Sequence, residues 1–360
     1  MKVGRVIFVL GNLELGGAER QALILARHLS EHEQAGIEVW GFNRTGPVAD
    51  ICERHGLKWR VVPLQNPFDV RSLARRLRES RPDILLPYTL VPNVVCGLIW
   101  QQIGARLCIW NQRDEGLFDI NKKWQLRAAQ RTPQFIANSH AGARYVVKTL
   151  NVDAAKVRVI SNGIELSPPQ ADRREWRRRL EIDEASFVAC MVANVHANKD
   201  HETLLRAWSI VVQQMNAVLV LAGRHYGAYE SLAQLTNELG IANNVRFTGP
   251  VSDVAGLLSA ADLGVFSSRS EGCPNGVLEC MAAGLAIVGT DIEGIREVVG
   301  EKQTRFLAPP ADAERFANMI LELANDPASR ISIGAANQSR IKERYNARRM
   351  CEETISLLGT

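Results

Sequence analysis

Two glutamates, Glu271 and Glu279, stand eight residues apart around a turn that leads into a short predicted helix. Pro274 and Asn275 lie between them, and both residue types are common in turns and at helix starts. The free N–H groups at a helix start attract anions such as a diphosphate. We expect Glu279 in the first turn, where its carboxylate can accept hydrogen bonds from a diol, while Glu271 reaches the other end of the ligand. This spacing predicts a site that holds a nucleotide-sugar by its ribose, phosphates and sugar.

A second polar segment, VANVHANKDH, follows a predicted strand over Phe187–Val192 and precedes a predicted helix over His201–Gln213. Lys199 within it can place an ammonium group against a diphosphate leaving group. Arg224 also follows a predicted strand, over Ala217–Ala222, so it is a further candidate cation for the same site.

The segment EGCPNGVLE resembles the signature of the retaining glycosyltransferases of family 4, which is Glu-Gly-x-Pro, four residues and Glu. The preceding SRS and the following CMAAG extend the match, and the resemblance covers nearly the whole chain. It implies the GT-B fold: an α/β protein of two doubly wound Rossmann-like domains that face each other across a cleft. It also implies transfer of a sugar, with retention of configuration, from a nucleotide-diphosphate donor to a saccharide or lipid-linked saccharide in cell-surface polysaccharide or glycolipid assembly.

The same resemblance implies roles for individual residues. Glu271, Lys199 and Arg113 are the expected catalytic residues, with Glu271 binding sugar hydroxyls and Glu279 binding the ribose. A loop that frames the nucleobase contains Val251. The full set of expected donor-binding residues is Gly16, Gly17, Asn194, Lys199, Arg224, Val251, Glu271, Gly272, Cys273, Pro274, Asn275, Gly276, Val277, Leu278 and Glu279.

Two positions depart from the family pattern. Asn194 stands five residues before Lys199, where the family usually has an arginine, so charge neutralisation falls to Lys199, the helix dipole and a compensating Arg224. Arg113 stands where many relatives have a histidine; it cannot act as a base, but it can hydrogen-bond a sugar or a phosphate. Retention does not need a strong base if the leaving phosphate oxygen takes the acceptor's proton on the same face.

These departures leave two other functions open. One is a non-catalytic partner subunit that binds a nucleotide-sugar without transferring it. The other is a different GT-B chemistry, such as nucleotide-sugar 2-epimerisation or phosphorolysis. Release of nucleoside diphosphate separates transfer from binding alone, and an epimerase needs no acceptor.

Composition limits the partners. A net charge of +4 over 360 residues is too small to indicate nucleic-acid binding. The seven scattered cysteines form no CxxC pair, which favours a reducing cytoplasm. No Asp-x-Asp occurs, and His196 and His201 flank Lys199 without a metal-ligand motif, so we expect no metal and no cofactor.

Membrane contact is predicted only at the surface. The longest apolar runs are far shorter than the ~20 residues that span a bilayer. The opening MKVGRVIFVLGN leads into an amphipathic helix and is interpreted as a first strand, without a signal-peptide cleavage site. Three basic clusters could be solvated helix faces or peripheral contacts with the inner membrane surface; they lie at Arg71–Arg81, Lys122–Arg127 and Arg173–Arg179.

Strand-like and helical segments alternate along the chain, which predicts parallel sheets with helices on both faces. The turn Asn162-Gly163 and the pair Pro168-Pro169 place the domain joint near Asn162–Asp172. We expect an acceptor-side domain over 1–165, a nucleotide-sugar donor domain over 166–340 and a terminal helix over 341–360 that crosses back to the first domain. The expected strands are Arg5–Leu10, Ile37–Phe42, Trp59–Val62, Ile84–Pro87, Arg106–Trp110, Phe135–Ala137, Val157–Ile160, Phe187–Val192, Ala217–Ala222, Val245–Thr248, Leu263–Phe266 and Ala286–Gly289.

Overall fold

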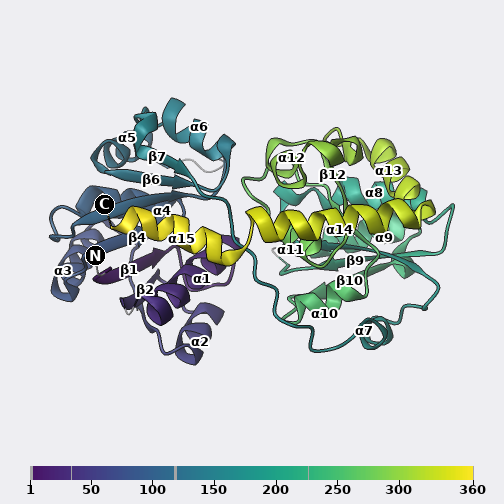
Figure 1. Cartoon of the computed structure of the whole chain (residues 1–360), viewed down its shortest axis with the longest axis horizontal. Helices are drawn as coiled ribbons and strands as arrows, with labels where there is room; N and C mark the ends of the chain where they lie inside the picture. Colours follow the sequence, from purple (N-terminus) through teal and green to yellow (C-terminus); the bar gives the residue numbers. More distant parts are fainter. Residues whose placement is uncertain (1–2, 34, 117–119, 226, 360) are drawn as a thin grey trace. The chain divides into compact units, whose positions relative to one another are not determined.

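The structure, a computed structural model, describes residues 3–33, 35–116, 120–225 and 227–359. The chain divides into two compact units (Figure 1): residues 1–163 with 347–360, and residues 164–346. Each unit contains one sheet, and its recorded strand pairings are all parallel. The prediction of two doubly wound α/β units is therefore confirmed.

The first unit has a seven-stranded sheet in the order β3-β2-β1-β4-β5-β6-β7. Successive side chains of β1 are buried in two different apolar clusters. Val6, Phe8 and Leu10 belong to one cluster, while Ile7 and Val9 belong to the other. Successive side chains of a strand point to opposite faces, so both faces of this sheet carry helices. The strands are β1 (Arg5–Leu10), β2 (Gly36–Phe42), β3 (Lys58–Val62), β4 (Ile84–Pro87), β5 (Leu107–Gln112), β6 (Gln134–Ala137) and β7 (Val157–Val159).

Helices cover both faces of this first sheet. Buried side chains of α1, α2 and α15 lie on the face that includes Phe8, and those of α3 and α4 lie on the face that includes Ile7. The segment that returns to the first unit begins at Ala347, because the preceding residues up to Arg344 form a helix of the second unit. The helices are α1 (Gly17–His32), α2 (Pro47–Arg54), α3 (Pro67–Ser80), α4 (Leu90–Ile99), α5 (Lys122–Arg131), α6 (His140–Lys148) and α15 (Ala347–Leu358).

The second unit has a six-stranded sheet in the order β10-β9-β8-β11-β12-β13. One continuous apolar cluster packs around it. The strands are β8 (Phe187–Val192), β9 (Ala217–Ala222), β10 (Val245–Gly249), β11 (Leu263–Phe266), β12 (Ala286–Thr290) and β13 (Leu307–Ala308). Strand β13 was not predicted from the sequence, because two residues are too few to show an alternating pattern.

The helices of the second unit connect these strands and cover the sheet. The basic helix α14 packs on α11. The helices are α7 (Arg173–Arg179), α8 (His201–Val211), α9 (Tyr229–Glu238), α10 (Val254–Ser259), α11 (Asn275–Ala282), α12 (Glu293–Val299), α13 (Ala313–Asn325) and α14 (Pro327–Arg344). Among the helices formed by the described residues, none combines the length and apolar character needed to cross a bilayer.

Both sheets change winding direction once. In the first unit the chain runs outward from β1 through β2 to β3, and β4 then lies on the other side of β1. In the second unit β11 lies on the other side of β8 in the same way. Ligands of such sheets bind beyond the carboxyl ends of the strands at these switch points. The loops after β1, β4, β8 and β11 are therefore the places to examine for a site.

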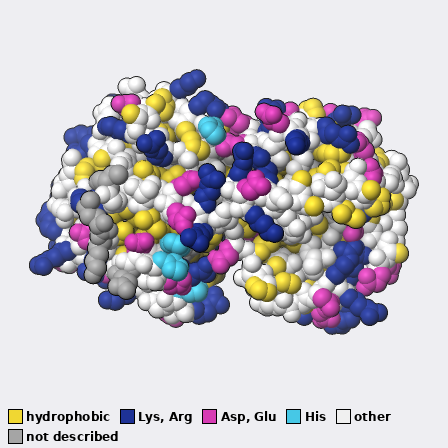
Figure 2. Space-filling view, viewed as in Figure 1, with side chains coloured by type: hydrophobic (Ala, Val, Ile, Leu, Met, Phe, Trp, Pro, Cys, Tyr) yellow, Lys and Arg dark blue, Asp and Glu magenta, His cyan; other side chains and the backbone are white. Residues whose placement is uncertain are grey.

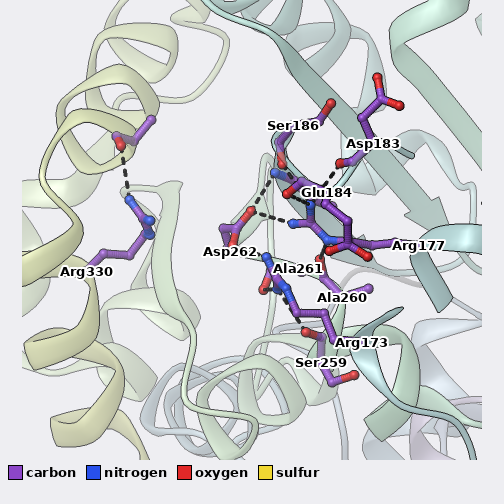
Figure 3. Close-up of polar contacts among 12 residues, drawn as sticks. Arg173, Arg177, Asp183, Glu184, Ser186, Ser259, Ala260, Ala261, Asp262 and Arg330 are labelled. Carbon is purple, nitrogen blue, oxygen red and sulfur yellow. Dashed lines mark hydrogen bonds and ion pairs between the residues drawn. The ribbon is translucent and has the colours of Figure 1, made fainter. Parts of the chain in front are cut away.

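Helix α7 is fixed to the second unit by a buried ionic cluster (Figure 3). The Arg177 side chain is 1% exposed and meets Asp262 at 3.0 Å, and Arg173 meets the other carboxylate oxygen at 2.8 Å. The Arg177 guanidinium also donates hydrogen bonds to the carbonyl oxygens of Asp183, Glu184, Ser186 and Ala260. The interpretation of Arg173–Arg179 as a solvated face or membrane contact is thus wrong for Arg177, which is buried among oxygen acceptors.

Exposed charges of both signs are interspersed over the face drawn in Figure 2. On the face drawn in Figure 2, dark-blue basic side chains alternate with magenta acidic ones on both units. Part of this mixing comes from pairs within helices, such as Arg348 with Glu352 and Arg349 with Glu353. On this face the basic side chains are therefore mixed with acidic ones and are not gathered into one basic field.

Candidate functional site

The loop after β8 ends in a tight turn that presents Lys199. Residues Ala197–Lys199 form one turn of 3₁₀ helix, and the His196 side chain accepts a hydrogen bond from the Asn198 N–H at 3.2 Å. Asp200 follows with a φ of 48°, in the left-handed region that few residues other than glycine adopt. This turn separates Lys199 from α8, so the ammonium lies on the loop and not on the helix face.

The loop after β11 carries Glu271 into the start of α11. The Ser268 hydroxyl donates to the Glu271 carboxylate at 2.7 Å. A side chain at Gly276 would collide with the Val192 carbonyl oxygen at the end of β8, so only glycine allows α11 to begin this close to the strand. The two loops at the β8–β11 switch point are therefore packed directly against each other.

Four contacts fasten these loops together. The Asn198 side chain donates to the Ser270 carbonyl at 2.7 Å, and the Arg269 N–H donates to the Asn198 carbonyl at 2.9 Å. The Ser267 hydroxyl donates to the Lys199 carbonyl at 2.9 Å, and the Arg269 guanidinium pairs with Asp200 at 3.0 Å. Apart from Lys199, none of these positions was assigned a role from the sequence, although the SRS that precedes Glu271 contains Arg269 and Ser270.

The Lys199 ammonium forms an ion pair with the Glu271 carboxylate. The two side chains are 24% and 11% exposed, so both keep access to solvent and to a ligand. A partly buried cation beside an uncapped helix start can stabilise negative charge that develops on a leaving group. The structure thus brings together the two residues that the sequence analysis placed in one site.

The start of α11 has fewer backbone N–H groups for an anion than expected from the sequence, which included Gly276, Val277 and Leu278 among the donor-binding residues. Pro274 occupies the N-cap position and supplies no side-chain cap; Gly276 is partly exposed there, whereas Val277 is buried. The Leu278 N–H donates to the Pro274 carbonyl at 3.2 Å, because it closes the first hydrogen bond of the helix. Gly272, Cys273 and Pro274 are buried in the turn.

Glu279 lies deeper than expected. The helix begins at Asn275, so Glu279 starts the second turn and not the first. It is 5% exposed. Burial raises the pKa of the Cys190 thiol in β8 to about 12, and the Glu279 charge contributes to that shift. Glu279 is therefore a buried residue of α11, the helix that packs on β8.

Asn194 and Arg224 lie at neighbouring strand ends. The Asn194 side-chain oxygen accepts a hydrogen bond from the Arg224 N–H at 3.0 Å, so Asn194 joins the loops after β8 and β9. The expected loop residue Val251 lines a cavity of about 490 Å³ at the outer strand β10. Phe247 and Trp176 also line this cavity.

An aromatic cluster of His225, Tyr229 and Phe247 follows Arg224 and was not predicted from the sequence. His225 stacks on Tyr229 with ring centroids 4.5 Å apart, and Tyr229 meets the Phe247 edge at 5.2 Å. The three residues come from the loop after β9, the start of α9 and β10, so no local pattern could have joined them.

In the first unit, Gly16 and Gly17 lie at the start of α1 and Arg113 follows β5. Gly16 is the N-cap of α1 and supplies no side-chain cap. Arg113 lies over the Tyr88 ring at 4.6 Å and donates to Asn111 at 3.0 Å and to Asn162 at 3.2 Å. Whether these residues complete a donor site with the second unit stays a prediction.

Side chains of the types that bind metal ions are not grouped into a site within the described residues. In the part of the chain that the structure describes, no three His, Cys, Asp or Glu side chains are grouped so as to hold a metal ion. His28 and His32 lie four residues apart on α1 with ring centroids at 4.5 Å, a pair that the sequence analysis overlooked. All seven cysteines lie in the described part of the chain, where they are buried and form no disulfide.

Comparison with known protein families gives two matches. Residues 15–168 match the family described as Glycosyltransferase Family 4, and residues 186–326 match the family described as Glycosyl transferases group 1. The two segments fall in the first and second units in turn, apart from residues 164–168. Lys199, Glu271 and Glu279 lie within the second match.

Individual relatives are more distant. The chain is 27% identical over 216 residues to D-inositol 3-phosphate glycosyltransferase of Streptomyces avermitilis, covering 56% of this chain and 47% of that protein. It is 23% identical over 270 residues to UDP-Gal:alpha-D-GlcNAc-diphosphoundecaprenol alpha-1,3-galactosyltransferase of Escherichia coli, covering 71% and 70%. The chain spans about half the length of the first curated relatives that it matches.

The fold itself is shared across the full length of a solved structure. Anabaena Alr3699/HepE in complex with UDP-glucose superposes with a TM-score of 0.87 at 20% identity, covering 99% of each chain. This similarity confirms the expected fold, and at this identity it establishes the fold alone.

Proposed function

Because the chain belongs to the group 1 and family 4 glycosyltransferases, we propose that it transfers a sugar from a nucleoside-diphosphate donor to an acceptor hydroxyl. The observation that carries this proposal is the ion pair of Lys199 with Glu271 at the β8–β11 switch point, beside the uncapped start of α11. A cation and free N–H groups suit a diphosphate, and a carboxylate suits sugar hydroxyls.

Each residue of this site has a distinct task in the proposal. Lys199 and the N–H groups of Gly276 and Val277 stabilise the diphosphate as it leaves, Glu271 orients the sugar, and Glu279 binds the ribose. The leaving phosphate oxygen takes the acceptor's proton on the face that it vacates, so the anomeric configuration is retained. Fixed positive groups are then the main catalytic device, because charge develops on the diphosphate in the transition state.

The proposal also gives roles to Asn194 and Val251 in the second unit and to three residues of the first unit. Asn194 can donate its side-chain N–H groups to a phosphate oxygen while its oxygen holds the loop after β9. Val251 lies in the loop that would frame the nucleobase. Arg113, Gly16 and Gly17 act from the first unit, where we propose that the acceptor binds. The donor is used as a substrate, and no metal or cofactor enters the proposal.

The substrates are proposed by class. The names of the Escherichia coli relative and of the HepE complex contain a UDP-sugar, which supports a uridine nucleotide as the first donor to test. The relatives' names also contain a phosphorylated cyclitol and a lipid-linked saccharide, which supports a saccharide or lipid-linked acceptor in polysaccharide or glycolipid assembly.

We further propose that the protein works in the cytoplasm and contacts an anionic membrane surface. Helix α3 carries exposed arginines and begins near Phe68, which is 75% exposed. Helix α5 carries Lys122, Lys123 and Arg127 around Trp124, which is 51% exposed. Basic side chains with an exposed aromatic ring suit an anionic lipid surface. Co-sedimentation with vesicles containing phosphatidylglycerol tests this contact, and equal binding to neutral vesicles would contradict the charge-based account.

The transfer proposal is tested first by ligand-induced stabilisation. We expect UDP, GDP or ADP to raise the melting temperature, since a ligand at 100 times its dissociation constant adds ~2.7 kcal/mol to the free energy of unfolding. The stabilising nucleotide is then tested as a sugar donor. Release of nucleoside diphosphate that depends on an added acceptor supports transfer. Binding without any turnover indicates a non-catalytic subunit, and conversion without an acceptor indicates an epimerase.

A further inference from the structure

Arg113 is a partly buried cation whose partners are all neutral. Its guanidinium donates to the side-chain oxygens of Asn111 and Asn162, and it lies over the ring of Tyr88 at 4.6 Å. Within the described residues, no carboxylate pairs with it. Burial raises the pKa of Tyr88, so this phenol stays neutral and gives no counter-charge.

The guanidinium keeps unused donors. An arginine has five N–H donors, and two hydrogen bonds occupy two of them. The Nε–H is buried and has no hydrogen-bond partner. Taking a cation partly out of water without a counter-ion is unfavourable unless a ligand supplies the missing charge.

The side chains around Arg113 are buried and hydrogen-bonded. Asn111 is 1% exposed; it donates to the carbonyls of Pro87 and Ile109 and exchanges two hydrogen bonds with Asn93. The Asn138 side chain donates to the Arg113 carbonyl at 3.2 Å. This network fixes both the backbone and the head group of Arg113, so the guanidinium is positioned before any ligand arrives. Preorganised donors of this kind bind more tightly than flexible ones.

Arg113 also lies at the correct edge of the sheet for a ligand. It follows β5, and Tyr88 follows β4, which borders β1 at the switch point of the first unit. A planar guanidinium matches the two oxygens of a phosphate or a carboxylate better than it matches a neutral hydroxyl.

We propose that the first unit selects a substrate with an anionic group, a phosphate or a carboxylate, which binds to Arg113 as its missing counter-ion. This inference rests on the proposed function in one respect: the substrate of the first unit is taken to be the acceptor. It makes Arg113 a residue that determines specificity, and it excludes neutral saccharides as good ligands of this unit.

The test is calorimetric titration of the whole chain saturated with UDP, which occupies the proposed diphosphate site of the second unit. The probes are glucose 1-phosphate, glucuronic acid and the neutral methyl glucoside. We expect the phosphate or the carboxylate probe to bind at least about tenfold more tightly than the neutral one, as for a hydrogen bond to a charged group. Comparing the two charged probes identifies which anion is selected.

Two variants and one control locate the effect. Arg113→Gln removes the charge, and Asn162→Asp keeps the acceptor of the Arg113 hydrogen bond while adding a carboxylate that neutralises it. Both should abolish the preference for the charged probe, and Arg76→Gln, on the exposed side of α3, should retain it. If Arg113→Gln does not fold, the Asn162→Asp variant alone tests whether the Arg113 charge causes the preference for the charged probe.

Equal affinity for the charged and neutral probes in the wild type would overturn the inference, as would a preference that survives in both variants. The proposed function fails separately, when UDP and the other nucleoside diphosphates do not bind. The two failures are distinguishable, because UDP is titrated before the probes are added and its proposed contacts with Lys199 and Gly276 lie in the second unit.

Discussion

The Lys199 ammonium contacts the Glu271 carboxylate although the two residues are 72 positions apart in the sequence. Each comes from the loop that follows one of the two strands at the switch point of the second sheet. Four further contacts fasten the loops to each other, so the pair is held in one place. The pair is neutral as a whole, and a bound diphosphate would share the ammonium with Glu271.

Removal of the Lys199 ammonium should slow sugar transfer. We expect Lys199→Ala to reduce the turnover number at least tenfold, because loss of one positioned donor in a transition-state site costs ~10²–10³ in rate. Steady-state release of nucleoside diphosphate measures this. Lys302→Ala, at an exposed lysine of the same unit, should turn over like the wild type. Unchanged turnover in Lys199→Ala would remove Lys199 from the site.

Glu279→Ala should weaken binding of the free nucleoside diphosphate by about tenfold or more, because it removes hydrogen bonds between a charged group and the ribose. Titration calorimetry with UDP measures the affinity. The matched control is Glu230→Ala, an exposed glutamate of α9. Glu279 is 5% exposed, so the melting temperature of the variant is measured alongside. Equal affinities in a folded variant would contradict the ribose assignment.

Arg177→Ala should destabilise the second unit by about 3–5 kcal/mol, the cost of breaking a buried ion pair. The substitution leaves the Asp262 carboxylate and four carbonyl oxygens without this donor. Urea denaturation followed by circular dichroism measures the loss. Arg178→Ala changes the next residue, which is exposed and pairs with Glu175, and it should have no measurable effect. Similar stabilities for the two variants would show that the cluster does not anchor α7.

His201 makes stability depend on pH. Burial, followed by the nearby Lys199 charge, lowers the pKa of His201 to about 4. In the unfolded chain the His201 side chain takes up a proton near pH 6.5, whereas in the folded chain it does so only near pH 4. Protonation of His201 therefore favours unfolding as the pH falls from about 6.5 to about 4. We expect a loss of up to about 3 kcal/mol in the free energy of unfolding over this window.

The test is urea denaturation at several pH values between 4 and 7, a range that brackets the folded and unfolded pKa values of about 4 and 6.5. His201→Gln removes the titrating group and should reduce the loss of stability at low pH. His55→Gln, at an exposed histidine, should follow the wild-type curve. Parallel curves for the wild type and His201→Gln would show that His201 does not cause the pH dependence.

Local patterns in the sequence predicted most of the strands well. Arg5–Leu10, Ile84–Pro87, Phe187–Val192, Ala217–Ala222 and Leu263–Phe266 were predicted with their observed ends. Each is a short apolar run between polar turns, and the signal for such a run lies within the run itself. The strand β13 is too short to carry this signal, and it forms by pairing with β12.

The sequence predicted which residues lie at the candidate site more accurately than it predicted their burial and their contacts. The segment EGCPNGVLE placed Glu271 and Glu279 around a helix start, which the structure has. It could not predict that Glu279 lies in the second turn and is buried, because that depends on how α11 packs on β8. Nor could it predict that the oxygen of Asn194 holds the loop after β9, since the two loops meet only when β8 and β9 pair.

The sequence by itself determined the elements, their alternation and the chemical groups available to a nucleotide-sugar site. The tertiary structure alone decided that Lys199 pairs with Glu271, that Arg177 is buried with Asp262, and that Arg113 is surrounded by neutral partners. The physical reason is distance along the chain. Helix and strand patterns arise from residues a few positions apart, whereas these contacts depend on the order of strands in a sheet, which the sequence of a single strand does not specify.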